Sequence, residues 1–181
     1  MQTPWGPSQD VQTFIDGVIF VATAGHGGFN LSPDQNAKVH PAWRIAGAWY
    51  EEDCEAAIAV LTFKEAFKPH QVEEAHKIAK DYFPREYQTV FNVTIPLAES
   101  WKLRREDFDR RTINSFVVTC ASGDWHSEVP PGSVHVYAKR KSDNLERCFY
   151  VPNEEYGNRG EMSFIIDEAR HIQALPLKEA A

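Results

Sequence analysis

The sequence predicts a single α+β domain in which helices pack on one face of a mostly antiparallel sheet. Residues 54–61 and 72–82 carry apolar side chains at the spacing of amphipathic helices, and shorter stretches are apolar or alternating, as strands are. With 181 residues, of which 43% are hydrophobic, the chain is long enough for one well-developed core. We expect one domain over residues 1–181, helix-rich to about residue 85 and strand-rich from about 86 to 175, with the helices packed on a sheet built largely from the second half.

The first elements are predicted to be a hairpin and a short helix. Residues 18–22 are apolar and β-branched, which is typical of a buried strand. After a glycine-rich turn at residues 23–28 the chain returns through residues 29–31, which indicates antiparallel pairing. Ser32 and Pro33 then suit the N-cap and first position of a brief helix.

Two longer helices follow in the first half. The first is expected to begin near Glu51, with three acids in its first turn, where negative charge meets the positive end of the helix dipole. The second is expected over residues 70–82 and is ended by Pro84. In the second half, residues 99–111 predict a charged, solvated helix. The strands expected there are residues 90–95, 116–120, 134–139, 147–151 and 164–166.

Composition excludes several classes of protein. The chain has 26 acidic and 19 basic residues and a net charge of −7, so direct binding to nucleic acid is not expected. The longest apolar run is far shorter than a membrane span, and the first residues lack the features of a secretory signal, so we expect no membrane association and a location in the cytoplasm. The histidines and cysteines show no metal-ligand spacing, and neither a metal nor a cofactor is predicted.

The stretch Gly25-His26-Gly27-Gly28 is the most distinctive local feature. Its glycines permit positive φ angles and a close approach of the backbone to a ligand. The turn can present His26 as a general acid or base, or present N–H groups to an anion. It is not a P-loop, because Phe29 stands where that motif requires lysine. The alternative is a tight turn that carries an incidental histidine.

A second candidate joins two aromatic rings to three acids, at Trp49, Tyr50, Glu51, Glu52 and Asp53. Such a cluster suits a contact surface for another protein, or supplies a carboxylate for proton transfer or metal binding. The alternative is a helix N-terminus with a tryptophan packed beneath it.

A third candidate, Asp124, Trp125 and His126, follows directly on a predicted strand, where loops often carry functional residues. His126 can pair with His26 or Glu52 if the chain brings them together. The alternative is a turn with a buried tryptophan and a surface histidine.

Several short segments together carry a resemblance. They are Thr3-Pro4-Trp5-Gly6, His26-Gly27-Gly28-Phe29 with Leu31-Ser32, Trp49 to Cys54, Ser122 to His126, Val151-Pro152 with Glu155-Tyr156, and Asp167 with Arg170-His171. As a set, from about Thr3 to His171, they resemble an uncharacterised domain family of bacterial plasmids, phages and integrative elements. The resemblance implies an accessory protein of a mobile element, and it implies no catalytic residue.

Two functions are therefore expected as alternatives. The first is a binding protein that inhibits or modifies a host protein or ribonucleoprotein machine, such as a defence nuclease complex, in an anti-CRISPR-like or anti-restriction-like way. Its binding residues would be Gly27, Gly28, Trp125 and residues 49–53. The second is a small enzyme in which His26, His126 and a carboxylate such as Glu52 or Asp124 act as acid and base on a ligand held by residues 25–28. Both assume that the three candidate stretches converge on one surface.

Overall fold

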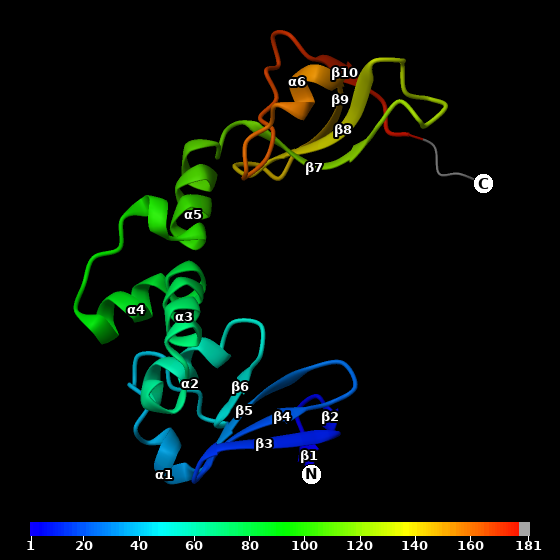
Figure 1. Ribbon diagram of the computed structural model, residues 1–181. Coiled ribbons are helices and arrows are strands. Elements are labelled where there is room, and N and C mark those ends of the chain that lie inside the picture. The colour runs from blue at the N-terminus through cyan, green and yellow to red at the C-terminus, as the bar shows by residue number, and fades with distance from the viewer. Residues whose placement is uncertain (178–181) are drawn as a thin grey trace. The chain divides into compact units, whose positions relative to one another are not determined.

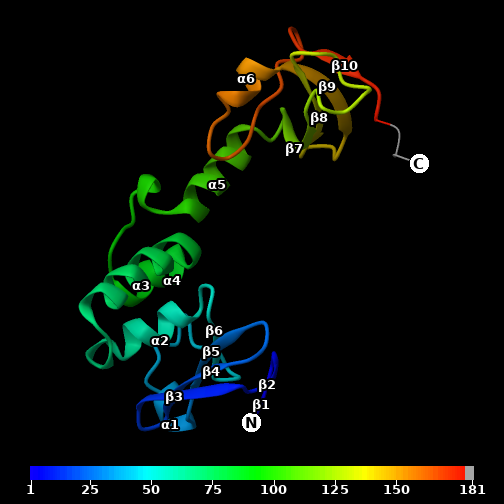
Figure 2. The same ribbon diagram turned by 45° about the vertical axis from the view of Figure 1, so that its right-hand side comes forward.

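The computed structural model describes residues 1–177 and has a mixed α+β fold, which confirms the predicted class. All paired strands are antiparallel. The chain divides into two compact units, residues 1–104 and residues 105 onward, and each has its own four-stranded sheet. The expectation of a single domain over residues 1–181 stays a prediction. The helices and strands of each unit are labelled in Figure 1 and Figure 2.

The first unit contains a four-stranded sheet of order β3-β4-β5-β6 and a separate two-stranded sheet, β1-β2. Its strands are β1 (Gln2–Thr3), β2 (Gly6–Pro7), β3 (Asp10–Ile15), β4 (Val18–Ala22), β5 (Gly27–Leu31) and β6 (Trp49–Glu51). Its helices are α1 (Pro33–Asn36), α2 (Ala56–Thr62), α3 (Pro69–Tyr82) and α4 (Pro84–Phe91), with short 3₁₀ turns η1 (Lys64–Ala66) and η2 (Leu97–Glu99). Helix α5 (Trp101–Arg111) spans the boundary between the two units.

The core of the first unit lies between its sheet and its own helices. Phe29 and Tyr50, from β5 and β6, are buried against Ile58 of α2 and Ala79 of α3. Helix α2 contacts both β5 and β6. The first-half helices therefore pack on a first-half sheet, whereas the sequence predicted a sheet built largely from the second half. The difference arises because β3 and β6 are paired strands that the hydrophobic pattern does not reveal: β3 is almost wholly exposed and β6 is only three residues long.

The second unit is built on a sheet of order β10-β9-β8-β7. Its elements are β7 (Phe116–Ser122), β8 (Ser133–Arg140), β9 (Glu146–Pro152), α6 (Asn153–Gly157) and β10 (Ile172–Ala174). Strict alternation buries Val134, Val136 and Ala138 on one face of β8, as predicted, and they pack with Phe116 and Phe149 in a second core.

Two of the predicted strands differ in the structure. Residues 90–95 form the end of α4 and a coil, because Pro84 begins a new helix after stopping α3. Residues 164–166 form an isolated bridge, in which Ile165 pairs with Val117. Within residues 1–177, none of the helices has the length and apolar character that a membrane span requires.

Candidate functional site

Pairing of β5 with β6 brings the glycine–histidine turn to the acidic stretch. Strands β5 and β6 lie side by side (Figure 1). Gly28 lies opposite Glu51 in the antiparallel register, so His26, just before β5, lies beside the end of β6. The Glu52 N–H donates to the Gly27 carbonyl oxygen at 3.0 Å and continues this pairing beyond β6. Two of the three sequence-predicted stretches therefore meet within the first unit.

His26, Glu51 and Glu52 form one cluster of polar side chains at this edge. His26 Nδ1 lies 3.6 Å from Glu51 Oε1, and one ligand atom from each of the three residues lies within 4.8 Å of the others. The His26 side chain is 58% exposed and that of Glu51 is 22% exposed. The cluster is therefore accessible from solvent on the histidine side and partly covered on the glutamate side.

The backbone around the cluster holds these side chains in place. Thr23 closes the turn: its N–H and its hydroxyl both donate to the His26 carbonyl oxygen, at 2.8 and 2.7 Å. The Asp53 N–H donates to Glu51 Oε2 at 2.9 Å, and the Glu51 N–H donates to Glu55 Oε2 at 3.1 Å. Glu51 Oε1, in contrast, is buried and has no hydrogen-bond partner among the described residues.

Two glycines of the turn are required for space. Gly27 and Gly28 have ordinary strand conformations, so the positive φ angles suggested by the sequence are not found at these positions. A Cβ atom on Gly28 would lie 2.5 Å from the Tyr50 carbonyl oxygen and would overlap the Trp5 ring. A Cβ atom on Gly27 would lie 2.6 Å from Glu52 Oε2. The glycines thus let Trp5 and Glu52 lie directly over the backbone of β5.

The two aromatic residues at this edge have different roles. Trp49 is partly exposed and makes an edge-to-face contact with Trp5, with ring centroids 5.6 Å apart. Tyr50 is fully buried, and its hydroxyl donates to Asn36 Oδ1 at 2.6 Å and accepts from the Ile45 N–H at 3.2 Å. Burial raises the pKa of Tyr50 above its ordinary value. Tyr50 is therefore a core residue, which corrects its assignment as a binding residue.

The acidic stretch does not form the first turn of a helix. Glu51 ends β6, Glu52 and Asp53 lie in the following turn, and α2 begins only at Ala56. The strand extends to Glu51 because Trp49 and Tyr50 pair with β5 and side chains of that type suit a pleated sheet. The carboxylates therefore have no role as helix N-terminal charges.

We name residues Glu51, Glu52, Asp53 and Glu55 the acidic edge. Within residues 1–177, none of these four carboxylates forms an ion pair with lysine or arginine, and His26 lies 3.6 Å from Glu51. Other acids of the chain are paired, as Asp107 is with Arg111 at 2.8 Å. The acidic edge is thus a group of four neighbouring acids without a direct ion pair to lysine or arginine in the described part of the chain.

The third stretch lies in the second unit, in the loop between β7 and β8. Asp124 Oδ2 accepts hydrogen bonds from the Gly132 N–H at 2.9 Å and from Asn153 Nδ2 at 3.1 Å. His126 Nδ1 accepts from the Glu128 N–H at 3.3 Å. Asp124 and His126 each fasten the loop, and they do not bond each other. Convergence of this loop with His26 stays a prediction.

Trp125, between these two residues, is 80% exposed. The alternative of a turn with a buried tryptophan is therefore wrong. The indole is accessible from solvent, and the assignment of Trp125 as a binding residue stays a prediction.

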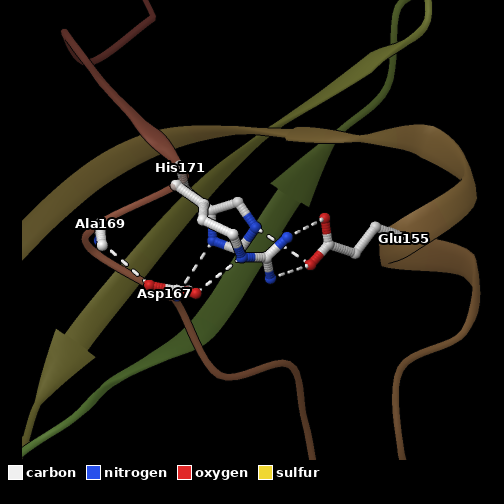
Figure 3. Close-up of polar contacts among 5 residues, drawn as sticks. Glu155, Asp167, Ala169 and His171 are labelled. Carbon is white, nitrogen blue, oxygen red and sulfur yellow. Dashed lines mark hydrogen bonds and ion pairs between the residues drawn. The ribbon is translucent and has the colours of Figure 1, made fainter.

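The second unit contains a network of charged groups that the sequence analysis did not propose as a site. Its residues were noted only because they contribute to the family resemblance. Arg170 donates to Glu155 Oε1 at 2.7 Å and to Asp167 Oδ2 at 2.6 Å, as Figure 3 shows. Buried His171 accepts the Asp167 N–H at Nδ1 and has Nε2 3.3 Å from Glu155 Oε1. The Arg170 guanidinium lowers the pKa values of both carboxyl groups below their ordinary range. This network ties α6 to the segment that precedes β10.

Fold and site together define an α+β protein with an acidic, partly aromatic edge on its first unit. The family described as Domain of unknown function (DUF7007) matches residues 1–113, more than half of the chain, and the protein belongs to this family. The expectation of an uncharacterised domain family is thereby confirmed, although the match ends close to the end of α5 and the sheet of the second unit lies outside it. Searches of curated proteins and of solved structures give no match.

Proposed function

We propose that this protein is a binding protein and that the acidic edge of its first unit contacts a basic segment of the partner. The single observation that carries the proposal is that, within the described chain, the four carboxylates at residues 51, 52, 53 and 55 form no ion pair with lysine or arginine. A partner that supplies lysine or arginine would neutralise this charge, and complementary charge speeds association and selects the correct partner.

The neighbouring aromatic residue suits the same role. Trp49 is two residues before Glu51 on β6, so both side chains lie on the same face of the strand, and Trp49 is partly exposed. Tryptophan is enriched in protein interfaces because its ring buries a large apolar area and its N–H remains available for a hydrogen bond. A partly exposed tryptophan on the same strand as an acidic residue is therefore a suitable contact for a partner that presents both charge and apolar area.

The resemblance to proteins of phages, plasmids and integrative elements supports a more specific proposal. In that setting the partner is a host protein or ribonucleoprotein machine in the bacterial cytoplasm, such as a defence nuclease complex. Nucleases carry basic surfaces that bind phosphate, and an acidic protein that covers such a surface competes with the nucleic acid. Inhibition by this competition is the activity that we propose.

Affinity purification from a bacterial lysate with quantitative mass spectrometry tests the proposal. Glu52→Lys/Asp53→Lys reverses two exposed, adjacent acids at the acidic edge, and the matched control Glu73→Lys/Glu74→Lys reverses two exposed, adjacent acids of α3. We expect the first variant to lose about tenfold or more of the captured partner and the control to retain it. Equal capture by both variants and the parent protein would contradict the proposal.

A small enzyme is the second candidate function, and the His26–Glu51 distance of 3.6 Å favours it. A carboxylate next to an imidazole can orient the ring for proton transfer to or from a substrate. Ester, amide and phosphate ester substrates can be assayed with the parent protein and with His26→Ala. A loss of about 100-fold or more at an unchanged melting temperature would support the enzyme. Turnover that His26→Ala leaves intact would reject it.

A further inference from the structure

The His26–Glu51–Glu52 cluster combines three side chains that are able to bind a metal ion. Each residue offers one atom of a type that binds metal ions: an imidazole nitrogen from His26 and a carboxylate oxygen from each glutamate. These atoms lie within 4.8 Å of one another. Bonds of about 2.0–2.2 Å to a common ion place neighbouring ligands roughly 3–4 Å apart, so only small side-chain rotations are needed.

One carboxylate oxygen of Glu51 is placed where it could bind a cation. The Asp53 N–H holds Oε2 of this carboxylate, while Oε1 is buried, has no hydrogen-bond partner among the described residues and faces His26. A buried polar atom without a partner is unfavourable, and a cation bound at Oε1 would satisfy it. The N–H bond to Oε2 is the kind of second contact that orients a ligating carboxylate.

The structure also brings the third ligand into place. Glu52 Oε2 occupies the space next to the Gly27 Cα that any other residue would fill with its Cβ atom. The Glu52 backbone is held by its hydrogen bond to Gly27. Glu52 is therefore positioned over the strand that begins directly after His26.

We propose that His26, Glu51 and Glu52 bind one divalent transition-metal ion, of the class of Mn²⁺ or Zn²⁺. An imidazole with two carboxylates favours these ions over Mg²⁺ and Ca²⁺, which prefer oxygen ligands alone. Three protein ligands leave positions open for water or for a group from another molecule. The proposal requires only these three side chains; it shares Glu51 and Glu52 with the acidic edge but does not require a partner to be bound.

The experiment measures binding of Mn²⁺ to the purified full chain by electron paramagnetic resonance of the free ion, with Zn²⁺ as competitor. His26→Ala is the decisive variant, because it leaves the number of acids unchanged and so separates coordination from general attraction of cations to negative charge. Its matched control is His70→Ala, which removes an exposed histidine from the first turn of α3. Glu52→Gln and its control Glu73→Gln form a second pair of variants. Each removes one negative charge, so a difference between them reflects the position of the carboxylate and not the net charge.

We expect one saturable site that Zn²⁺ displaces, with affinity reduced about tenfold or more in His26→Ala and Glu52→Gln and unchanged in both controls. Circular dichroism melting confirms that each variant is folded. Absence of saturable binding, or equal binding by His26→Ala and the parent protein, overturns the site. Metal binding is measured on the purified protein without a partner, and partner capture is measured separately in the presence of a chelator. Failure of the metal site and failure of partner binding are therefore recognised independently of each other.

Discussion

Gly28 of β5 lies directly beneath the Trp5 ring, with no room between them for a side chain. The Tyr50 carbonyl oxygen closes the same space from β6, at 2.5 Å from the position of a Cβ atom. A side chain at this position would require the Trp5 ring and the β6 backbone to shift. The surface that presents His26 and the acidic edge therefore depends on this glycine.

Gly28→Ala is expected to lower the free energy of unfolding by about 1–3 kcal/mol, because the added methyl group overpacks the space between Trp5 and Tyr50. Gly25→Ala is the control, since a Cβ atom there meets nothing within 4 Å. Urea denaturation followed by tryptophan fluorescence measures both. Equal stability of the two variants would show that the structure accommodates a methyl group at Gly28 and would contradict this prediction.

Tyr50→Phe is expected to destabilise the protein by about 1–3 kcal/mol, because removal of the hydroxyl leaves Asn36 Oδ1 and the Ile45 N–H without their buried partner. Tyr82→Phe, at an exposed position, is expected to change stability by less than about 0.5 kcal/mol. Thermal denaturation of both variants provides the comparison. A neutral Tyr50→Phe variant would contradict a structural role for this hydroxyl.

Asp124→Ala is expected to lower stability by about 1 kcal/mol, because two hydrogen bonds to Gly132 and Asn153 are lost at the surface. Chemical denaturation and the affinity purification described above are measured on the same variant. We expect reduced stability with unchanged partner capture. Unchanged stability with abolished capture would instead make Asp124 a functional residue.

The Arg140–Asp143 pair predicts a specific pH dependence of stability. A hydrogen bond from Arg140 lowers the pKa of Asp143 from 3.8 to about 2. Because the folded-state pKa is below the unfolded value, the contribution of the pair is complete above pH 3.8 and is lost as the pH falls towards about 2. We expect Asp143→Asn to melt below the parent protein at pH 6 and to approach it at pH 2. A constant difference between the two melting temperatures would contradict this account.

The elements with a clear hydrophobic period were predictable from the sequence. The strand at residues 18–22 is β4, and the helix expected over residues 70–82 is α3. Strand β3 was missed because its side chains are almost all exposed and show no apolar alternation. The strand expected at residues 90–95 was wrong because Pro84 suits the first position of a helix as well as the end of one.

The candidate site was predictable only in its parts. The residues of the turn and the acidic stretch attracted attention by their types, whereas the approach of His26 to Glu51 depends on the register of β5 against β6. Residues 32–48 separate the two strands, so no tight hairpin turn in the sequence specifies this register. The role of Gly27 and Gly28 likewise depends on neighbours that are remote in sequence, Trp5 and Glu52.

The central claim is that the acidic edge is the contact surface for a partner, and zero-length cross-linking tests it most directly. A carbodiimide joins a carboxylate to a lysine that it touches, so mass spectrometry of the cross-linked, captured complex identifies the acids at the interface. We predict that Glu52 and Asp53 are joined to lysines of the partner, while Glu73 and Glu74 of α3 are not. A complex cross-linked only through acids outside residues 51–55 would contradict the account.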